Sequence, residues 1–239
     1  MRLLAGLLGM AVLAGCATGP DADPRDPLEP WNRAVYQFND NVDHVLATPV
    51  ATVYRSILPV GIRDRVRNFF ANIADPFIGV NNVLQGKIED GFLDWMRFAV
   101  NSTVGLFGIH DVATDMGLEK HNEDFGQTFG RWGVGTGPYL VLPIFGSSDL
   151  RDGVGFVVDI YADPLTNVRP HDVQYLLYGL RFTQTRTDLL DASRILEEAA
   201  LDKYTFQRDA YLQRRRSLVY DGRPPREREF DDEDDNKPH

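Results

Sequence analysis

The sequence GVGTGPYLVLPIFGSSD, which runs from Gly133 to Asp149, has no charged residue before its last position, whereas 25% of the whole chain is charged. Glycines precede Pro138, and a short apolar run, Tyr139 to Phe145, follows it and is interrupted by Pro143. Proline disfavours a regular helix, and a helix that crosses a bilayer needs about 20 residues. The stretch is therefore predicted to be an apolar, glycine-flanked loop that does not span a membrane.

The first sixteen residues, MRLLAGLLGMAVLAGC, have the features of a secretory signal peptide, with Arg2 followed by an apolar core and small residues. The segment LAGC, Leu13 to Cys16, matches the bacterial lipobox, whose cysteine is acylated and becomes the mature N-terminus. An ordinary signal peptide with a chance cysteine, or an uncleaved anchor, is the alternative. Because Cys16 is the only cysteine, we predict a signal peptide over residues 1–15, lipidation of Cys16 and no internal disulfide.

The composition limits the classes of partner. The chain has 239 residues and a formal net charge of −10, which argues against nucleic acid and against attraction to anionic lipid by charge alone. Membrane contact besides the acyl anchor is therefore expected to come from apolar surface. We predict an acylated N-terminus with a flexible tether over residues 16–25, one helical domain over 26–220 and a disordered acidic tail over 221–239.

The first helix of this domain is predicted to begin at Asp26, which can cap it, with Pro27 in its first turn. Its apolar residues recur every three or four positions on one face, and they are Trp31, Val35, Phe38, Val42 and Val45. Thr48 and Pro49 are expected to end this helix and begin a second one.

Further helices are predicted toward the C-terminus. Ser148 or Asp149 is expected to cap a helix that runs to about Ala162, and long amphipathic helices are expected over residues 172–200 and 200–220. The three consecutive arginines 214–216 are interpreted as a solvated turn favoured by the helix dipole.

Two stretches of predicted helix, residues 69–86 and 98–109, contain Asn, Ser, Thr and Gly where surface helices usually carry Lys and Glu. The first has only Asp75 as a charged residue and the second has none. Such helices are either central to a large helical core or face something that is neither water nor core. With little strand-like alternation anywhere, the fold class is predicted to be all-α.

The sequence lacks a convincing catalytic motif. FGSSD, Phe145 to Asp149, does not have the second glycine of a nucleophile elbow. GVGTGP, Gly133 to Pro138, lacks the lysine and the helix start of a phosphate-binding loop. We therefore predict that the protein is not an enzyme and uses no cofactor.

Two groups of titratable residues have bland interpretations. His121, Glu123 and Asp124 lie in a polar loop and are interpreted as solvated side chains in preference to a metal site. His110 lies beside Asp111 after an apolar segment, where a helix-start cap is favoured over an acid–base pair. No metal site is predicted.

Five segments, taken together and in order, resemble the MlaA/VacJ family of outer-membrane lipoproteins of Gram-negative bacteria. The resemblance runs from the lipobox at Cys16 to about Tyr220. Besides the lipobox, the segments are DPLEPWNRAVYQFND (26–40), NFFANIADPFIGVNNVLQG (68–86), FAVNSTVGLFGIHDVAT (98–114) and FGQTFGRWGVGTGPYLVLPIFGSSDLRDGVG (125–155). The last of them contains the stretch quoted at the start.

This resemblance implies a ring-like bundle of amphipathic helices that lies in the periplasmic leaflet of the outer membrane, with a Gly/Pro-rich hairpin loop beside a central channel. Members of the family remove mislocalised phospholipids from the outer leaflet beside a trimeric porin. They pass the lipids to a periplasmic lipid-carrier protein that feeds an inner-membrane ABC transporter, which maintains lipid asymmetry. The alternatives are a lipoprotein phospholipase acting on the same lipids and a structural lipoprotein that scaffolds porins.

The resemblance also assigns candidate residues. Phe38 and Asn39 correspond to a family motif and are expected to hold the hairpin in its working position, although Phe38 would equally suit the core. Apart from the resemblance, we hypothesise that uncharged polar side chains of the charge-poor stretches pass a headgroup without trapping it by strong ion pairing, and these are Asn72, Asn81, Asn82, Asn101, Ser102 and Thr103. Of these, Asn101 is expected to line the channel. The remaining residues expected at the channel and hairpin are Gly133, Gly135, Gly137, Pro138, Tyr139, Leu140, Leu142, Pro143 and Phe145.

Overall fold

The computed structural model describes residues 23–225, apart from the side chains of residues 198 and 199. Cys16, the predicted signal peptide and most of the predicted tail lie outside the described residues. The helices, in chain order, are α2 (Glu29–Val42), a π-helical turn (Asp43–Ala47), α3 (Thr48–Ile57), α4 (Val60–Leu84), α5 (Ile88–Thr103), α6 (Val112–Asp115), α7 (Phe125–Arg131), α8 (Leu150–Ala162), a 3-10 turn (Pro164–Asn167), α9 (His171–Ala199) and α10 (Lys203–Val219).

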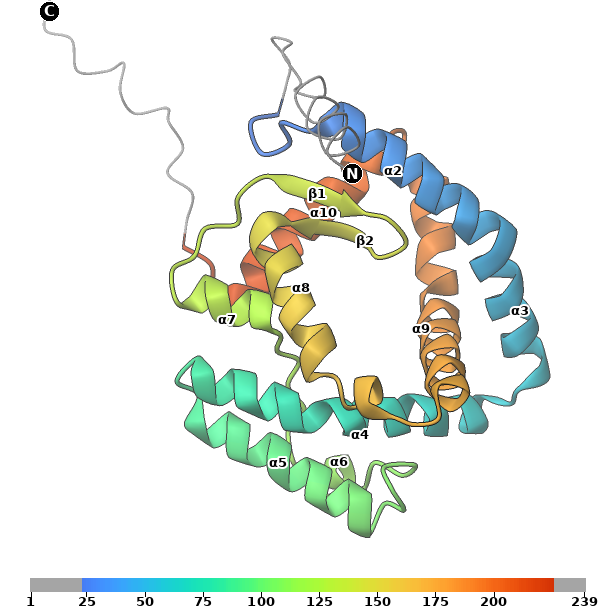
Figure 1. The fold of residues 1–239 in the computed structure, drawn as a ribbon, viewed down its shortest axis with the longest axis vertical. Coiled ribbons are helices and arrows are strands. Elements are labelled where there is room, and N and C mark those ends of the chain that lie inside the picture. The colour runs from blue at the N-terminus through green and yellow to red at the C-terminus, as the bar shows by residue number, and fades with distance from the viewer. Residues whose placement is uncertain (1–22, 226–239) are drawn as a thin grey trace, which may run out of the picture.

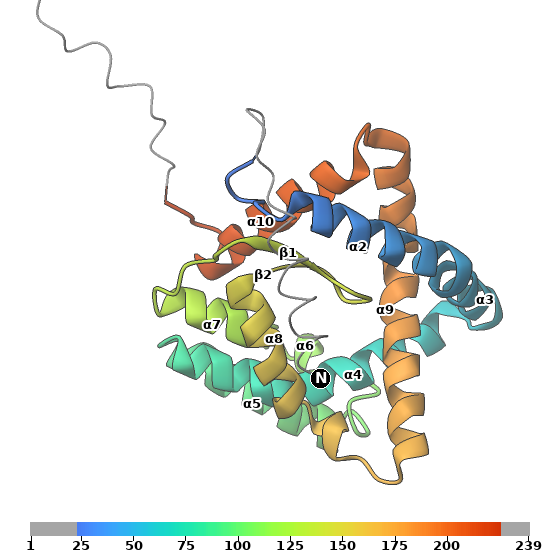
Figure 2. The same cartoon turned by 45° about the horizontal axis from the view of Figure 1, so that its top comes forward.

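These helices follow one another around a ring (Figure 1). Helix α5 packs along α4, α9 packs along α3, and α8 packs against α7. Turning the molecule shows α9 as a long rod on one side of the ring, with α10 returning beside the hairpin (Figure 2). The prediction of a mostly helical, ring-like fold is therefore confirmed. None of the helices within residues 23–225 combines the length and the hydropathy that a bilayer crossing requires.

The predicted apolar loop contains the one small sheet of the described chain. Strands β1 (Tyr139–Leu142) and β2 (Gly146–Asp149) pair antiparallel, with Tyr139 opposite Asp149 and Leu142 opposite Gly146. Pro143, Ile144 and Phe145 form the turn between them. Pro143 is tolerated here because a turn residue has no ladder hydrogen bond to lose. The stretch is thus a β-hairpin lying across the inside of the ring (Figure 1).

The first helix begins later than predicted. Helix α2 starts at Glu29, its N-cap Leu28 makes no side-chain cap, and Pro30 occupies the first turn. The predicted capping by Asp26 is wrong, because its carboxylate is buried and accepts hydrogen bonds from Asn32 and Tyr204 instead. The second helix, α3, begins at Thr48 with Pro49 in its first turn, as predicted, and the π-helical turn connects it to α2.

Predictions toward the C-terminus are closer to the structure. Asp149 caps α8 by accepting a hydrogen bond from the Asp152 amide, and α8 ends at Ala162 as expected. The two long helices are α9 and α10, close to their predicted bounds, but neither has the separate apolar and polar faces that were predicted. These ends are well predicted because a capping carboxylate and its amide partner are only three residues apart, so the signal is contained in the local sequence.

The distribution of polar and apolar side chains is inverted relative to a water-soluble helical bundle. In the described chain the buried positions of α4 are mostly polar or small, including Asn72, Asp75, Asn81 and Asn82. In the predicted stripe of α2, Val35 is buried, whereas Trp31, Phe38 and Val45 are 51%, 51% and 80% exposed.

The charge-poor stretch 98–109 is likewise exposed, with Val104, Leu106 and Phe107 open to the surroundings. The core interpretation is therefore wrong for residues 98–109. Large exposed apolar surfaces mark contacts with membranes or other proteins, so residues 98–109 are a candidate surface for such a contact.

Candidate functional site

A cavity of about 260 Å³ lies between α4, α8 and the 3-10 turn that follows α8. Apolar side chains of the two helices form one part of its wall, among them Phe77 of α4 and Phe156 of α8. Asn81, Asp124 and Asp159 contribute polar groups to the same cavity. The cavity is therefore amphipathic, and suits a molecule with both an apolar and a polar part.

The polar wall of the cavity is predominantly acidic. Burial and the neighbouring Asp124 carboxylate raise the pKa of Asp159 from 3.8 to about 6. The Asp159 carboxylate accepts a hydrogen bond from the Phe125 amide at 3.3 Å. Beside it, Arg181 forms an ion pair with Asp163 at 2.6 Å. The wall thus combines one carboxylate that is easily protonated with a paired cation.

The hairpin reaches this cavity through its turn. The ring of Phe145 lies 4.8 Å from the ring of Phe156, measured between centroids, and Phe156 lines the cavity. Phe145 is otherwise 65% exposed. The exposed apolar tip of the hairpin therefore lies beside the wall of the amphipathic cavity.

The backbone of the hairpin turn is strained. Ile144 has φ of 70°, a left-handed conformation that is unfavourable for a β-branched residue. Asn39 of α2 contacts both sides of this turn, since its side-chain amide donates to the Leu142 carbonyl at 2.9 Å and accepts from the Ile144 amide at 2.7 Å. The structure thus places Asn39 against the hairpin, where a positioning role was predicted. Phe38 is exposed, so the core alternative for it is wrong.

The predicted hairpin residues divide into two groups. Gly133, Gly135 and Gly137 are exposed, and Gly133 and Gly137 have positive φ angles of 90° and 67° that suit glycine. The side chains of Pro138, Leu140 and Leu142 are half-buried and that of Pro143 is exposed.

Tyr139 differs from the expectation that it meets lipid. Its side chain is fully buried and packs with Val35, Val141 and Tyr204 in the apolar core cluster, and its hydroxyl hydrogen-bonds to Ser147 at 2.8 Å. Strand alternation explains this correction, because Tyr139 and Val141 share one face of β1 and that face is covered.

Asn101 also differs from its prediction as a channel-lining residue. Its side chain is buried, its amide nitrogen donates to the Asp111 carboxylate at 2.9 Å, and its amide oxygen accepts from the Ala113 backbone at 2.9 Å. Both ends of the amide are therefore used inside the protein. Asn101 fixes the segment that leads into α6, and no part of it is left for a passing headgroup.

A buried ionic network lies at the base of the hairpin, and the sequence did not indicate it. Arg215 of α10 forms bidentate hydrogen bonds with Asp124, at 2.6 and 2.9 Å, and an ion pair with Asp152 at 2.5 Å. Asp124 caps α7, and Asp152 lies in the first turn of α8. Arg215 therefore joins two helix starts, and its interpretation as part of a solvated turn is wrong.

The two groups of titratable residues noted in the sequence, around His110 and around His121, have different outcomes. Asp111 caps α6 by accepting from the Thr114 amide, which confirms the cap interpretation. His121 and Glu123 are not simply solvated, because they pair with Asp94 at 3.1 Å and Lys87 at 2.9 Å. Within residues 23–225 no three His, Cys, Asp or Glu side chains are grouped in a way that could hold a metal ion.

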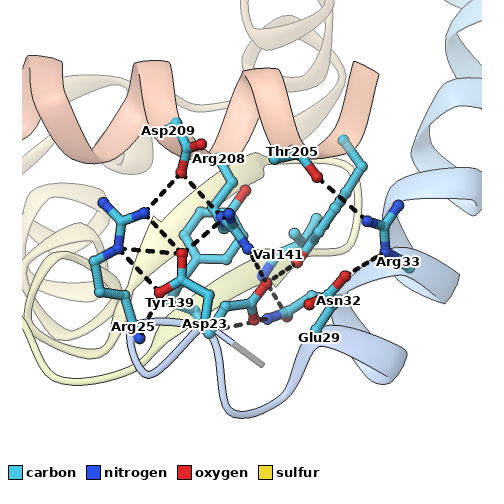
Figure 3. Close-up of polar contacts among 12 residues, drawn as sticks. Asp23, Arg25, Glu29, Asn32, Arg33, Tyr139, Val141, Thr205, Arg208 and Asp209 are labelled. Carbon is cyan, nitrogen blue, oxygen red and sulfur yellow. Dashed lines mark hydrogen bonds and ion pairs between the residues drawn. The ribbon is translucent and has the colours of Figure 1, made fainter. Parts of the chain in front are cut away.

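The residues just before α2 were predicted to belong to a flexible tether, but 23–25 are held against α10. Asp23 forms an ion pair with Arg208 at 3.0 Å, and Arg25 pairs with Asp209 at 3.1 Å (Figure 3). The hydrogen bond from Arg25 lowers the pKa of Asp23 to about 2. We call residues 23–26 the strap. The strap crosses the start of β1, where the Tyr139 amide donates to the Arg25 carbonyl at 2.9 Å.

Comparison with known proteins identifies relatives across almost the whole described chain. The model of the family described as MlaA lipoprotein matches residues 24–218. The chain is 38% identical over 222 residues to the intermembrane phospholipid transport system lipoprotein MlaA of Escherichia coli, covering 90% of this chain and 87% of that protein. It is 31% identical over 229 residues to the protein of the same name in Haemophilus influenzae, covering 92% and 91%.

A solved structure concerned with the maintenance of bacterial outer membrane lipid asymmetry shares the fold, with a TM-score of 0.71 and 34% identity. The superposition covers 81% of this chain and 98% of that chain. The similarity therefore extends over the ring of helices and the hairpin together.

Proposed function

The chain belongs to the MlaA lipoprotein family, and from this premise we propose that it removes mislocalised phospholipids from the outer leaflet of the outer membrane. The lipid passes through the amphipathic cavity and then to a periplasmic carrier protein that feeds an inner-membrane ABC transporter. Lipid asymmetry is maintained as a result. The protein is a transport component and carries out no chemical step on the lipid.

One observation supports this proposal most directly: the apolar tip of the hairpin, Phe145, contacts the cavity wall at Phe156. A phospholipid has acyl chains that need an apolar path and a headgroup that needs polar partners. The cavity offers both kinds of surface. The hairpin tip lies where an acyl chain that enters from the surrounding leaflet would meet the cavity.

The outer surface supports placement in one leaflet. The exposed apolar residues of α2 and of the segment after α5 have no water-compatible role, and no described helix is suited to cross a bilayer. A protein embedded in the periplasmic leaflet and anchored by acyl chains on Cys16 accounts for both facts. These exposed apolar residues of α2 and of the segment after α5, which we call the apolar rim, would also accommodate a trimeric porin as a neighbour.

The test is to fill the cavity in living cells. Ala74 lines the cavity on α4, and Ala74→Trp places an indole inside it. Ala99 is exposed on α5, and Ala99→Trp is the matched control for adding the same side chain elsewhere. A strain that lacks the gene is complemented with each variant, and phosphatidylethanolamine in the outer leaflet is labelled with a membrane-impermeant amine reagent.

We expect labelled lipid to remain as high with Ala74→Trp as without the gene, and to fall to the native level with Ala99→Trp. Full complementation by Ala74→Trp, at equal protein abundance, would mean that lipid does not pass through this cavity. Release of lysophospholipid and fatty acid would indicate a phospholipase. A change in porin abundance without a change in labelled lipid would indicate a porin scaffold.

A further inference from the structure

The outer edge of β1 has no neighbouring strand, yet its backbone groups are hydrogen-bonded. Strand β2 pairs with only one edge of β1. On the other edge, the Tyr139 amide donates to the Arg25 carbonyl of the strap. The next groups along this edge bind side chains of α2. An unpaired strand edge is usually blunted or covered, and here a strap and a helix cover it.

Asn32 and Asn39 of α2 make the same pair of contacts with β1 and the turn. The Asn32 amide donates to the Tyr139 carbonyl at 3.0 Å and accepts from the Val141 amide at 2.9 Å. The Asn39 amide donates to the Leu142 carbonyl and accepts from an amide two residues further along, as described above. Each side chain thus presents a donor and an acceptor in the way that a neighbouring β-strand would.

The spacing of the two asparagines matches the spacing of their partners. Seven residues of α-helix make almost two turns and rise by about 10.5 Å, so Asn32 and Asn39 lie on one face. Three residues of extended strand, from Tyr139 to Leu142, cover about 10 Å. Helix α2 therefore runs alongside β1 over this length, so that Asn32 covers the outer edge of β1 while Asn39 contacts the turn.

Asn32 is also connected to the C-terminal helix. It is fully buried, and its amide nitrogen donates to the Asp26 carboxylate at 2.8 Å. The second oxygen of Asp26 accepts a hydrogen bond from the Tyr204 hydroxyl and lies 3.5 Å from Arg208. Tyr204 and Arg208 belong to α10. Asn32 thus joins β1, the strap and α10, whereas Asn39 contacts only the turn end of the hairpin among these elements.

We propose that Asn32 is a positioning residue that fixes the hairpin at its base, so that Asn39 can hold the strained turn with Phe145 against the cavity wall. The proposal rests on the proposed function, because it assigns Asn32 a role in lipid passage. With the base released by loss of the donor to the Tyr139 carbonyl, Ile144 relaxes from its left-handed conformation, and Phe145 separates from Phe156. The hairpin and α2 otherwise behave as one rigid unit.

The chain offers a matched control for substituting Asn32. Asn82 is also fully buried and also donates to a buried carboxylate, that of Asp94, at 2.8 Å. Asn82 belongs to α4, and Asp94 belongs to α5. Asn32→Asp and Asn82→Asp are therefore the same isosteric change, each placing a carboxylate against a buried aspartate. Only Asn32→Asp removes a hydrogen bond to β1, the one that the Asn32 amide donates to the Tyr139 carbonyl.

The two variants are compared in the full-length, detergent-purified protein by hydrogen exchange and in cells by the amine-labelling assay. We expect Asn32→Asp to speed exchange of the amides of residues 139–146 by at least about tenfold, with residues 60–103 unchanged. Asn82→Asp is expected to speed exchange of amides within residues 60–103 and to leave exchange of residues 139–146 unchanged. In cells, Asn32→Asp should raise labelled outer-leaflet lipid, whereas Asn82→Asp at equal abundance should not.

The outcomes separate this proposal from the proposed function. If the hairpin amides of Asn32→Asp exchange at the native rate, the positioning role is overturned. It is also overturned if these amides exchange faster but the amount of labelled lipid stays at the native level, while Ala74→Trp still blocks complementation. Equal increases of labelled lipid in both aspartate variants would indicate general destabilisation and would also overturn it. If Ala74→Trp complements fully, the proposed cavity path fails independently. Should the aspartate variants not accumulate, Asn32→Ala and Asn82→Ala provide the same comparison without added charge.

Discussion

Asp159 shows how one side chain in the cavity wall affects the whole fold. Its pKa is about 6 in the folded protein and 3.8 for an ordinary aspartate. The folded state therefore binds a proton more tightly than the unfolded state does. This group contributes most to stability below about pH 4, and the contribution is lost as the pH rises through 6.

We predict that Asp159→Asn stabilises the protein at pH 7.5 by about 1–2 kcal/mol, because it removes a buried negative charge beside Asp124. The difference should vanish near pH 4. Urea unfolding in detergent at several pH values measures it, with Asp115→Asn at an exposed position as a control for losing one charge. An Asp159→Asn protein that is less stable than the native protein at pH 7.5 would contradict this prediction.

For single residues, hydrogen bonds to near neighbours in the sequence can be predicted, whereas hydrogen bonds between distant positions cannot. The caps at Asp111 and Asp149 follow from the sequence because each carboxylate bonds an amide three residues away. Arg215 bonds Asp124 across 91 positions, and Asn32 bonds Tyr139 across 107. Nothing near either residue reveals these partners. An arginine in a run of three is usually solvated, so the interpretation of Arg215 could only be corrected by the fold.

Among the elements, the pair formed by α4 and α5 depends on two glycines that face each other. A Cβ atom on Gly91 would lie 2.6 Å from the Val83 side chain and 2.8 Å from the Gly79 carbonyl. The second contact is with backbone, which cannot move aside cheaply. The two helices can approach this closely only because both positions lack a side chain.

We therefore predict that Gly91→Ala destabilises the protein by about 1–3 kcal/mol through overpacking. Gly61, in the first turn of α4, has open space where a Cβ atom would be added, so Gly61→Ala should be neutral or slightly stabilising. Thermal unfolding followed by circular dichroism compares the two. Equal stability of both variants would mean that α4 and α5 can separate without cost.

Element boundaries were predicted best where the sequence contains a cap or a proline turn, as for α8 and the hairpin. The faces of the helices were predicted less well. The stripe from Trp31 to Val45 has the spacing of an amphipathic helix, and the usual inference is that such a stripe is buried. Here most of it is exposed. Periodicity reveals that a helix has two faces, but the surrounding medium decides which of them points outward.

For the molecule as a whole, the exposed apolar residues predict where lipid contacts it. Trp31 and Trp132 are 51% and 56% exposed, whereas Trp95 is half-buried and donates a hydrogen bond to the Pro76 carbonyl. In vesicles that contain brominated phospholipid, we expect strong fluorescence quenching of Trp31 and Trp132 and weak quenching of Trp95. Variants that retain a single tryptophan measure each separately. Equal quenching of all three would argue against a defined apolar rim.

The helical ring and the family were predictable from the sequence, because charge-poor helices and ordered motifs extend along most of the chain. The cavity was not predictable residue by residue. Asn81 was expected to face a headgroup and lines the cavity, but Asn101 was expected at the channel and is used internally. Asp159 and Phe156 gave no signal and also line the cavity. A cavity is a property of how helices cross, and helix crossing is decided by long-range packing.

The strap has a consequence for how the chain acquires its shape. The hydrogen bond from Tyr204 to Asp26 spans 178 positions, so the first described residues find their partners only in the last described helix, α10. Contacts between such distant positions form slowly, since the intervening chain must first be ordered. In a polypeptide exported from its N-terminus, the strap would therefore emerge before α10, which carries its partners Tyr204 and Arg208. The hairpin edge would remain open until α10 arrived, and would need protection from misassembly until then.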